Sequence, residues 1–178
     1  MERLGELELS VSATTRAPRP GERDGVDYHF LTREEFDRKV QAGEFVEHAD
    51  YAGRSYGTLR SELDDRVRAG APVVLEIEVQ GARQVRRSVP DAVQVFIAPP
   101  SLDALRTRLV GRGTDDPEEV ERRLRVAAEE LAAQPEFAHV VVNDRLQDAL
   151  EQLTAVLAAE LDPRATTLED QPGKATQL

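Results

Sequence analysis

The chain has 178 residues, a formal net charge of −11 and an apolar content of 40%, which predicts one domain with a substantial hydrophobic core. It contains no cysteine, and this excludes disulfides, thiolate metal sites and a cysteine nucleophile. Its three histidines lack any zinc-binding spacing, so we expect no metal site made by the protein alone. The acidic balance argues against nucleic-acid binding, no apolar run reaches the roughly 18 residues of a membrane span, and no signal-peptide pattern is present. We therefore expect a cytoplasmic protein that binds neither nucleic acid nor membrane.

Residues up to about 70 predict a small mixed lobe of strands and helices. Thr32 and Glu35 form a capping box, which predicts a helix that ends at Gly43. The other expected elements of the lobe are strands over 7–11 and 26–30, a hairpin over 44–58 that turns at 52–53, and a helix with Leu59, Leu63 and Val67 on one face.

After residue 70, buried-type strands alternate with helices. Ser101 is expected to cap one helix, and Asp116 followed by Pro117 marks the start of another. The alternation predicts a parallel α/β sheet with helices on both faces. The tail over 162–178 is polar and aperiodic, so we expect it to be disordered. The expected strands span 72–81, 92–98 and 139–142, and a last amphipathic helix carries leucines at 146, 150, 153, 157 and 161.

Polar side chains follow the predicted parallel strands, at the sheet edge where ligands of open α/β sheets bind. Glu76 and Glu78 are two residues apart, so they share one face of their predicted strand. Two acids in an otherwise apolar strand are costly unless they are used. The alternative is charge that is solvated at the strand end. Asn143 follows the last predicted strand.

Arginines crowd the segment 106–125. Arg108 and Arg112 are four residues apart in a predicted helix and face the same way. An arginine-bearing flap of this kind suits a phosphoryl-transfer enzyme that closes over a triphosphate. The alternative is a solvated helix face with Glu–Arg pairs.

Arg16 and Arg19 lie in a different setting, a loop rich in proline and glycine that follows a strand. Two guanidinium forks together with the hydroxyl of Tyr28 can surround a phosphate monoester. Glu47 lies on a strand of the same lobe and can accept hydrogen bonds from the N1–H and N2 amino groups of guanine. Adenine lacks this donor pair, so one acid would select the base. Hydroxyls on neighbouring strands come from Ser12 and Thr58.

The chain from about residue 7 to residue 157 resembles the guanylate kinase family. The resemblance is carried, in family order and spacing, by "SVSATTRAPRPGERDGVDYHF", "GEFVEHADYAGRSYGT", "LEIEVQGA", "FIAPPSLDALRTRLVGRGTD" and "VVND". It implies a P-loop nucleoside-monophosphate-kinase fold and the ATP-dependent, magnesium-assisted phosphorylation of GMP to GDP in purine nucleotide metabolism. It also implies one domain over 1–161, with a GMP-binding lobe at about 10–70 and a lid with its flank at about 105–125.

The resemblance further implies a role for each candidate side chain. The positions expected to bind GMP are Ser12, Glu47 and Thr58 at the base, Arg16, Arg19, Tyr28 and Tyr56 at the phosphate, and the acids Glu76 and Glu78. Glu78 stands where the family usually has aspartate. The arginines expected to be catalytic, beside the transferring phosphoryl group, are Arg108, Arg112 and Arg123. Arg112 and Asn143 are expected to bind ATP.

The family begins with a strand, a GxxxxGK[ST] phosphate loop (P-loop) and a helix, and no such loop occurs in the 178 residues. One interpretation is a truncated kinase that lacks the first central strand of its sheet and is inactive without the P-loop. A second is a non-catalytic guanylate-kinase-like binding module, and a third is a product without function. The arginines of the lid segment serve phosphoryl transfer and favour the first interpretation.

Overall fold

The computed structural model describes residues 7–51, 53–68, 70–112 and 116–161, with Asp65 and Arg112 described by their backbone alone. The first part of the chain forms β1 (Glu8–Leu9), β2 (Ala13–Thr14), β3 (His29–Phe30), α1 (Arg33–Gln41), β4 (Phe45–Tyr51), β5 (Arg54–Leu59) and α2 (Arg60–Arg68). The second part forms β6 (Val73–Val74), α3 (Val79–Ser88), β7 (Val95–Ala98), α4 (Leu102–Arg112), α5 (Pro117–Ala132), the 3₁₀ turn η1 (Gln134–Glu136), β8 (His139–Val142) and α6 (Leu146–Glu160). The expected tail over 162–178 lies outside the described residues.

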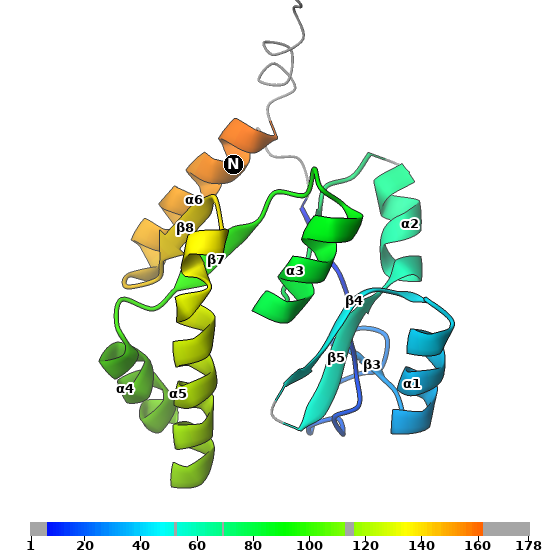
Figure 1. The fold of residues 1–178 in the computed structure, drawn as a ribbon, viewed down its shortest axis with the longest axis horizontal. Coiled ribbons are helices and arrows are strands. Elements are labelled where there is room, and N and C mark those ends of the chain that lie inside the picture. The colour runs from blue at the N-terminus through cyan, green and yellow to red at the C-terminus, as the bar shows by residue number, and fades with distance from the viewer. Residues whose placement is uncertain (1–6, 52, 69, 113–115, 162–178) are drawn as a thin grey trace, which may run out of the picture.

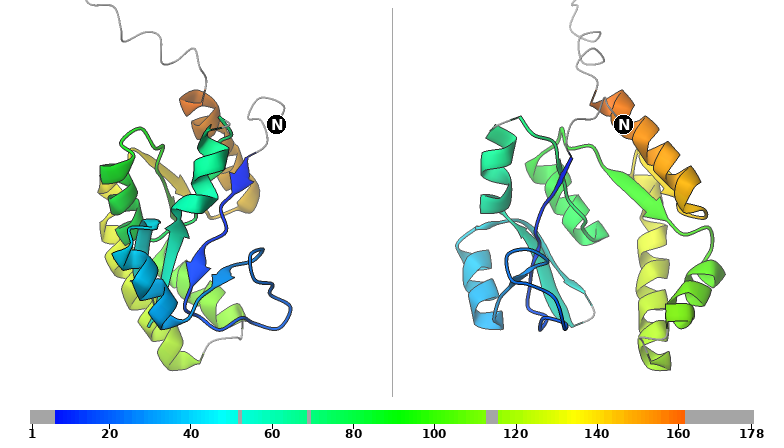
Figure 2. Two further views of the ribbon diagram at one scale, coloured as in Figure 1. Left: turned by 90° about the vertical axis from the view of Figure 1, so that its right-hand side faces the viewer. Right: turned by 180° about the vertical axis from the view of Figure 1, so that it is seen from behind.

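The elements gather into two halves with α3 between them (Figure 1). One half holds the strands β2 to β5 with α1 and α2, and we call residues 8–68 the N-terminal lobe. The other half holds β7 and β8 with α4, α5 and α6, as the view from behind also shows (Figure 2). None of the described helices is both long enough and apolar enough to span a membrane.

The sheet of the N-terminal lobe has the strand order β3-β2-β5-β4. The pair β2–β3 is parallel, whereas β2–β5 and β4–β5 are antiparallel. The expectation of a mixed lobe is therefore confirmed. The hairpin β4–β5 turns at Gly53, whose φ of 74° is a left-handed conformation that glycine adopts without strain.

A β-bulge in β4 separates the two faces of this sheet. Phe45 pairs with Leu59, yet Glu47, two residues later, pairs with Thr58, because the register shifts between Phe45 and Glu47. Cross-strand partners share a face, so the bulge places Phe45 and Glu47 on opposite faces of the sheet. Without the extra residue both side chains would lie on the same face.

The face that carries Phe45 is the core face, and α1 covers it. Phe36 of α1 contacts Phe45 with ring centroids 4.5 Å apart, and both side chains are buried. Ala13 and Leu59 complete this cluster. The predicted capping box is confirmed, because Thr32 accepts a hydrogen bond from the Glu35 backbone N–H while the Glu35 carboxylate accepts one from the Thr32 N–H. The cap and the core cluster together fix α1 on the sheet.

Outside the four-stranded sheet of the lobe, parallel strands occur as two separate pairs. β1 pairs with β6, and β7 pairs with β8 over four residues from Val95↔His139 to Ala98↔Val142. The two pairs are not hydrogen-bonded to each other within the described residues. Parallel pairing and covering helices agree with the predicted α/β class, although the single continuous sheet of that prediction is here divided.

The predicted strand over 72–81 is wrong in length. Only Val73 and Val74 are in a strand, and the chain turns into α3 at Val79, a helix that the sequence analysis did not predict. Residues 75–78 have no ladder partner among the described residues, and an apolar run without a partner strand does not form a ladder. In α3, buried Ala82 and Val85 lie three residues apart and provide its packing face.

The other predicted helices are confirmed, with corrections to their apolar faces. Asp116 caps α5 by accepting a hydrogen bond from the Glu119 N–H, with Pro117 in the first turn. Leu59 belongs to β5 and not to α2, and Val67 of α2 is 62% exposed. In α6, Leu146 and Leu150 are exposed, because the helix covers β8 with only part of its leucine stripe. The core of this half joins α4 to α5 through Leu109, Val120 and Leu124.

Candidate functional site

The face of the lobe sheet opposite the core cluster gathers the side chains expected to bind GMP. In the ladder, Tyr56 pairs with Ala49 and Thr58 pairs with Glu47. Residues two apart on a strand and cross-strand partners share a face, so Glu47, Tyr56 and Thr58 lie together. Tyr28 reaches the same group, with its ring centroid 6.4 Å from that of Tyr56. Ser12 lies beside this row, where its backbone carbonyl accepts a hydrogen bond from the His29 N–H at 2.9 Å.

At one end of this face, Glu47 and Thr58 form a buried polar pair. Oε1 of Glu47 accepts a hydrogen bond of 2.8 Å from the Thr58 hydroxyl, and the two residues are 3% and 0% exposed. Burial raises the pKa of Glu47, and the hydrogen bonds from Thr58 oppose that rise. The hydrogen bond therefore fixes the Glu47 carboxylate in a position that is almost inaccessible to water. A buried acceptor of this kind favours a ligand that donates hydrogen bonds to it over one that leaves it unpaired.

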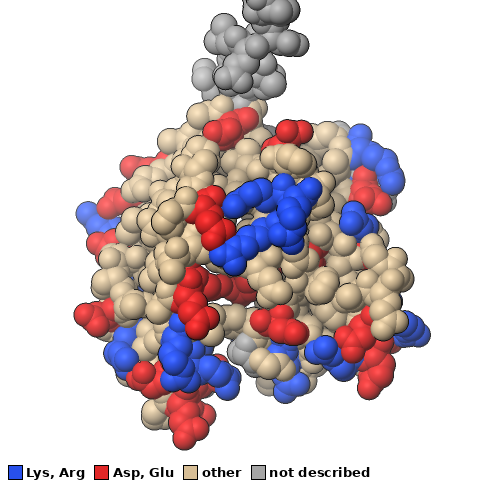
Figure 3. Space-filling view, in the orientation of Figure 1, with Lys and Arg blue, Asp and Glu red and all other residues tan. Residues whose placement is uncertain are grey.

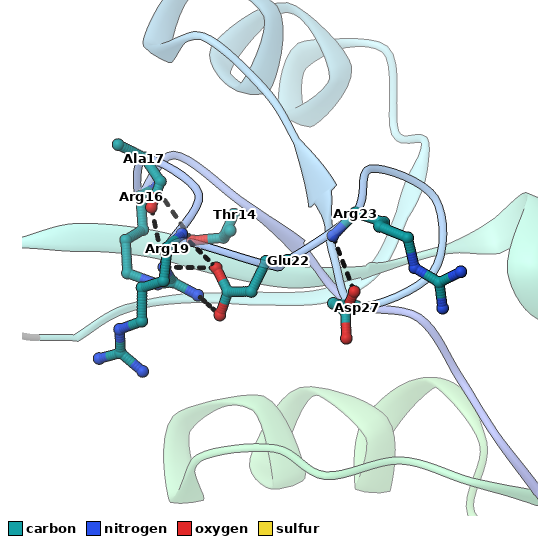
Figure 4. A network of polar contacts seen from close by, with 7 residues as sticks. All are labelled: Thr14, Arg16, Ala17, Arg19, Glu22, Arg23 and Asp27. Carbon is teal, nitrogen blue, oxygen red and sulfur yellow. Dashed lines mark hydrogen bonds and ion pairs between the residues drawn. The ribbon is translucent and has the colours of Figure 1, made fainter.

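At the other end, Arg16 is held in a fixed position by Glu22 (Figure 4). Its Nη1 and Nη2 donate to the two carboxylate oxygens of Glu22 at 3.0 and 2.9 Å, and Nη1 also donates to the Ala17 carbonyl at 2.8 Å. The pKa of Arg16 is raised and that of Glu22 is lowered, in both cases chiefly by their shared hydrogen bond. The contacts found in the described residues leave Nε of Arg16 unused. A second guanidinium edge is therefore open to a phosphate.

Aromatic rings and a backbone donor complete the surroundings of Arg16. Its guanidinium carbon lies 5.1 Å from the centre of the Tyr28 ring and 5.8 Å from that of Phe30. The Arg19 N–H donates to Glu22 at 2.6 Å, so one carboxylate ties both arginines of the loop together. Figure 4 shows the Arg19 guanidinium pointing away from Glu22. Arg16, Arg19, Tyr28 and Tyr56 thus form what we call the clamp.

The two acids expected at a strand end lie elsewhere. Both follow β6 outside any strand, so the prediction that they share a strand face is wrong. Glu76 is exposed, as solvated charge would be. Glu78 is the half-buried N-cap residue of α3 and shares a hydrogen bond with Glu130 of α5. Burial, the Glu130 carboxylate and the nearby Glu47 and Glu76 raise the pKa of Glu78 to about 8. Figure 3 shows acidic side chains along a hollow between the two halves.

The arginines of the lid segment are engaged in contacts of the second half. Arg108 donates from Nη1 to the Asn143 carbonyl at 2.7 Å and from Nη2 to the Asp144 carbonyl at 2.9 Å. The structure thus brings Arg108 and Asn143 together, through the backbone of Asn143. Arg106 pairs with Glu121 and Arg122 with Glu119, as on a solvated helix face.

Arg123 lines a pocket of about 210 Å³ between the two halves. The pocket is bounded by Tyr51 of β4, Phe96 of β7, Leu109 of α4 and Glu130 of α5, among others. The pocket therefore lies between the end of the lobe hairpin and the lid segment. The side chain of Arg112 lies outside the described residues.

The described residues contain no group of three or more histidine, aspartate or glutamate side chains that could hold a metal ion. The expectation that magnesium would have no protein-made cage remains a prediction, since Mg²⁺ is commonly held by one or two carboxylates together with substrate phosphates.

Comparison with known proteins decides the family. The sequence profile of "Guanylate kinase" matches residues 3–160. The chain belongs to the guanylate kinase family. It is 57% identical over 156 residues to a guanylate kinase of Frankia casuarinae, an alignment that covers 88% of this chain and 85% of that protein. It is 54% identical over 151 residues to a guanylate kinase of Streptomyces coelicolor, covering 85% and 77%.

The fold agrees with this assignment. A crystal structure of guanylate kinase from Anaplasma phagocytophilum superposes with a TM-score of 0.74 at 36% identity, covering 89% of this chain and 78% of that one. The resemblance of the motifs to the guanylate kinase family is therefore confirmed, and so is the mixed α/β fold class.

Within this guanylate kinase fold, three residues that shape the site did not emerge from the sequence. Glu22 is the first acid after Arg16 and Arg19, and its place in the same turn-rich loop is the one local signal that points to it. Gly81, beside Glu47, and Glu130, beside Glu78, become site neighbours only through the packing of α3 and α5. Such long-range contacts leave no local pattern.

Proposed function

We propose that this chain provides the GMP site of a guanylate kinase, an enzyme that transfers a phosphoryl group from ATP to GMP and forms GDP and ADP. The observation that carries the proposal is that the Glu47–Thr58 pair shares a sheet face with Tyr56, next to Tyr28 and the Arg16 guanidinium, in a chain that belongs to this family. A buried carboxylate near a cluster of arginine and tyrosine suits the base and the phosphate of a nucleoside monophosphate. Both substrates are cytoplasmic metabolites, which fits the expected location.

Base recognition is assigned to Glu47, with Thr58 and Ser12 supplying hydroxyls. The ionised carboxylate accepts hydrogen bonds from N1–H and the N2 amino group of guanine, while the Thr58 hydroxyl holds the carboxylate in place. Adenine offers no matching donor pair, so binding AMP would leave a buried charged acceptor unsatisfied.

Phosphate binding is assigned to the clamp. The edge of Arg16 that Glu22 does not occupy, the guanidinium of Arg19 and the hydroxyls of Tyr28 and Tyr56 would surround the GMP phosphate. This holds one phosphate oxygen in position to attack the γ-phosphorus of ATP. The new bond joins that oxygen to phosphorus, and the bond from the γ-phosphorus to the β,γ-bridging oxygen breaks to release ADP.

Transfer and ATP binding are assigned to the second half. Arg108, Arg112 and Arg123 would stabilise charge on the transferring group, and Asn143 and Arg112 would contact ATP. In the described structure Arg108 is bonded to backbone carbonyls, so this role requires the arginine to exchange those partners for phosphate. The acids Glu76 and Glu78 are assigned to the nucleotide site by their position before α3.

Magnesium is the metal that ATP chemistry calls for, and the described residues do not provide a cluster of ligands for it. We therefore assign no step to a protein-bound metal. The P-loop that would hold the β- and γ-phosphates of ATP has no counterpart in the 178 residues. The alternative function is a guanylate-kinase-like module that binds a partner without turning over GMP.

Equilibrium binding separates the two functions. The 178-residue chain is titrated with GMP, IMP and AMP by isothermal calorimetry, and we expect GMP to bind at least about tenfold more tightly than AMP, since one unpaired charged acceptor costs about 1–3 kcal/mol. Equal affinities for GMP and AMP would contradict the proposal and favour the binding module. A coupled ADP-release assay with ATP and Mg²⁺ is expected to show no turnover by this chain, because its sequence contains no P-loop.

A further inference from the structure

Helix α3 approaches the base-reading carboxylate more closely than any side chain would allow. Gly81, the third residue of α3, is buried. A Cβ atom at this position would lie 2.3 Å from Oε2 of Glu47 and 3.0 Å from its Cδ. A carbon and an oxygen that are not bonded do not approach to 2.3 Å, so a side chain at residue 81 and the present position of Glu47 exclude each other.

Backbone conformation does not require a glycine here. The described glycines with positive φ are at positions 21, 25, 43, 53 and 70, and Gly81 lies inside a regular helix. Glycine is among the least favourable residues in a helix interior. The helix backbone does not require glycine at position 81, but any side chain there would collide with Glu47. The glycine is therefore explained by the space that it leaves for the Glu47 carboxylate.

The space is occupied by one half of the Glu47 carboxylate. Oε1 is fixed by the Thr58 hydroxyl at 2.8 Å from the strand side, and Oε2 lies against Gly81 from the helix side. The carboxylate is thus enclosed between β5 and α3. A displacement of about 1 Å would misalign both oxygens from the two parallel donors of guanine, and hydrogen bonds weaken steeply with such misalignment.

We propose that Gly81 is a specificity-determining positioning residue, which acts by leaving the Glu47 carboxylate in the place where guanine is read. The inference rests on the proposed role of Glu47 in GMP binding. Gly81 does not itself contact the base in this account. Its contribution is made through Glu47.

The test is Gly81→Ala in the full 178-residue chain, with binding of GMP and IMP measured by calorimetry. IMP has the N1–H but lacks the N2 amino group, so the ratio of the two affinities reports how well the carboxylate reads guanine. We expect GMP affinity to fall about tenfold or more and the GMP-to-IMP preference to approach one, while the melting temperature stays within a few degrees of wild type because alanine suits a helix.

A matched control is Gly111→Ala in α4. Gly111 is also a helix glycine, but a Cβ there would have no neighbour within 4 Å among the described residues. The Gly111→Ala variant should gain the same helix propensity, and its affinities for GMP and IMP should equal those of wild type. A loss of preference in both variants would assign the effect to something other than the contact with Glu47 and would overturn the proposal.

A double-mutant cycle with Glu47→Ala decides the mechanism. If Gly81 acts by making room for Glu47, Gly81→Ala should cost at least about tenfold in GMP affinity in wild type but less than about twofold in the Glu47→Ala background. Equal costs in both backgrounds would overturn the inference. Should Gly81→Ala fail to fold, the double variant must recover the melting temperature of the Glu47→Ala single variant, and its failure to do so would overturn the inference by showing that Gly81 serves helix packing alone.

The outcomes separate this inference from the proposed function. A wild-type chain without preference for GMP over IMP contradicts both. A wild-type chain with that preference and a Gly81→Ala variant that keeps it contradicts the role of Gly81 and leaves the GMP site standing.

Discussion

The two halves of the molecule hold their candidate site residues in different ways. In the N-terminal lobe, the two central charged side chains each have an internal partner: Glu47 is paired with Thr58, and Arg16 is paired with Glu22 in a way that leaves its Nε unused. In the second half, Arg108 donates hydrogen bonds to the backbone carbonyls that follow β8, and Arg106 and Arg122 form surface ion pairs. In our proposal the lobe is organised for recognition before a ligand binds, whereas the arginines of the second half hold structural contacts until they exchange partners.

This difference follows from the secondary structure that carries each group. A strand ladder fixes which side chains are neighbours. The bulge between Phe45 and Glu47 places Phe45 on the core face of the sheet and Glu47 on the opposite face, with the other candidate site residues. Long arginines on helices have several rotatable bonds and are positioned by whichever acceptor is near. We therefore expect substitutions in the lobe to change GMP affinity far more than substitutions in the second half.

The largest effect is expected for Arg16→Ala. It removes the Arg16 donors of the clamp and leaves the Glu22 carboxylate without its guanidinium partner beside the phosphate. GMP affinity should therefore fall about ten- to hundredfold, as for a lost charge-assisted hydrogen bond of about 1.5–3 kcal/mol. Arg16→Lys should restore only part of this loss, because lysine lacks the fork. Calorimetry with GMP and with guanosine checks the assignment. Affinity for guanosine, which has no phosphate, should be unchanged in both variants.

Glu47→Gln should reduce GMP affinity by about tenfold and leave AMP affinity nearly unchanged. The amide nitrogen presents donors toward the N1–H and N2 amino groups of guanine, and a buried unsatisfied donor costs about 1–3 kcal/mol. The ratio of the dissociation constants for GMP and AMP is the readout. A ratio equal to that of wild type would mean that Glu47 does not read the base.

Glu22→Gln should have a smaller effect, about three- to tenfold weaker GMP binding. The neutral amide cannot hold both Nη atoms of Arg16 and the Arg19 N–H as a carboxylate does, so the clamp loses part of its organisation but keeps its positive charges. If instead GMP bound more tightly, Glu22 would act as a competitor of the phosphate rather than as support for Arg16.

The acids around α3 predict that stability falls as pH rises. The pKa of Glu78 is raised to about 8 in the folded chain, above the usual value of 4.5, so the folded state holds an extra proton between these values. Its stabilising contribution is complete below about pH 4.5 and is lost as the pH rises through about 8. The melting temperature should therefore decline by a few degrees more between pH 5 and pH 8 in wild type than in Glu78→Gln. Parallel pH profiles for the two proteins would contradict this.

The smallest effect on GMP binding is expected for Arg108→Ala. Loss of the two bonds to the Asn143 and Asp144 carbonyls should lower the free energy of unfolding by about 1 kcal/mol, measured by urea denaturation, while GMP affinity stays within about twofold. A tenfold loss of GMP affinity would place Arg108 in the GMP site and would remove the contrast between the two halves.

Local patterns predicted much of this structure. The capping box at Thr32, the N-cap at Asp116 and the hairpin that turns at Gly53 each depend on residues close in sequence, and each was confirmed. The strand over 72–81 was overestimated because strand length depends on partners that the run itself does not reveal. The exposure of Leu146 shows the same limit for helices, since periodicity indicates an apolar stripe but not how much of it a neighbour covers.

The candidate site was predictable to the same extent. Motif order predicts the residues of the clamp and Glu47. The strand register places Glu47, Tyr56 and Thr58 on one face, and Tyr28 and Arg16 lie next to them through ring contacts. The partners that hold them, Glu22 and Gly81, act through contacts that only the folded chain defines. Glu78 was expected in a strand, but the start of α3 moved it next to Glu130, where burial and a second carboxylate change its protonation.

The central claim is that GMP binds on the site face of the N-terminal lobe, and nuclear magnetic resonance tests it most directly. A ¹⁵N-labelled chain is titrated with GMP, and the backbone amides and the arginine Nε–H signals are followed. We expect shifts at Ser12, Arg16, Arg19, Tyr28, Glu47, Tyr56 and Thr58, with the Arg16 Nε–H moving most, and no shifts at Arg108 or Asn143. Shifts centred on Arg108 and Asn143, with the lobe signals unmoved, would contradict it.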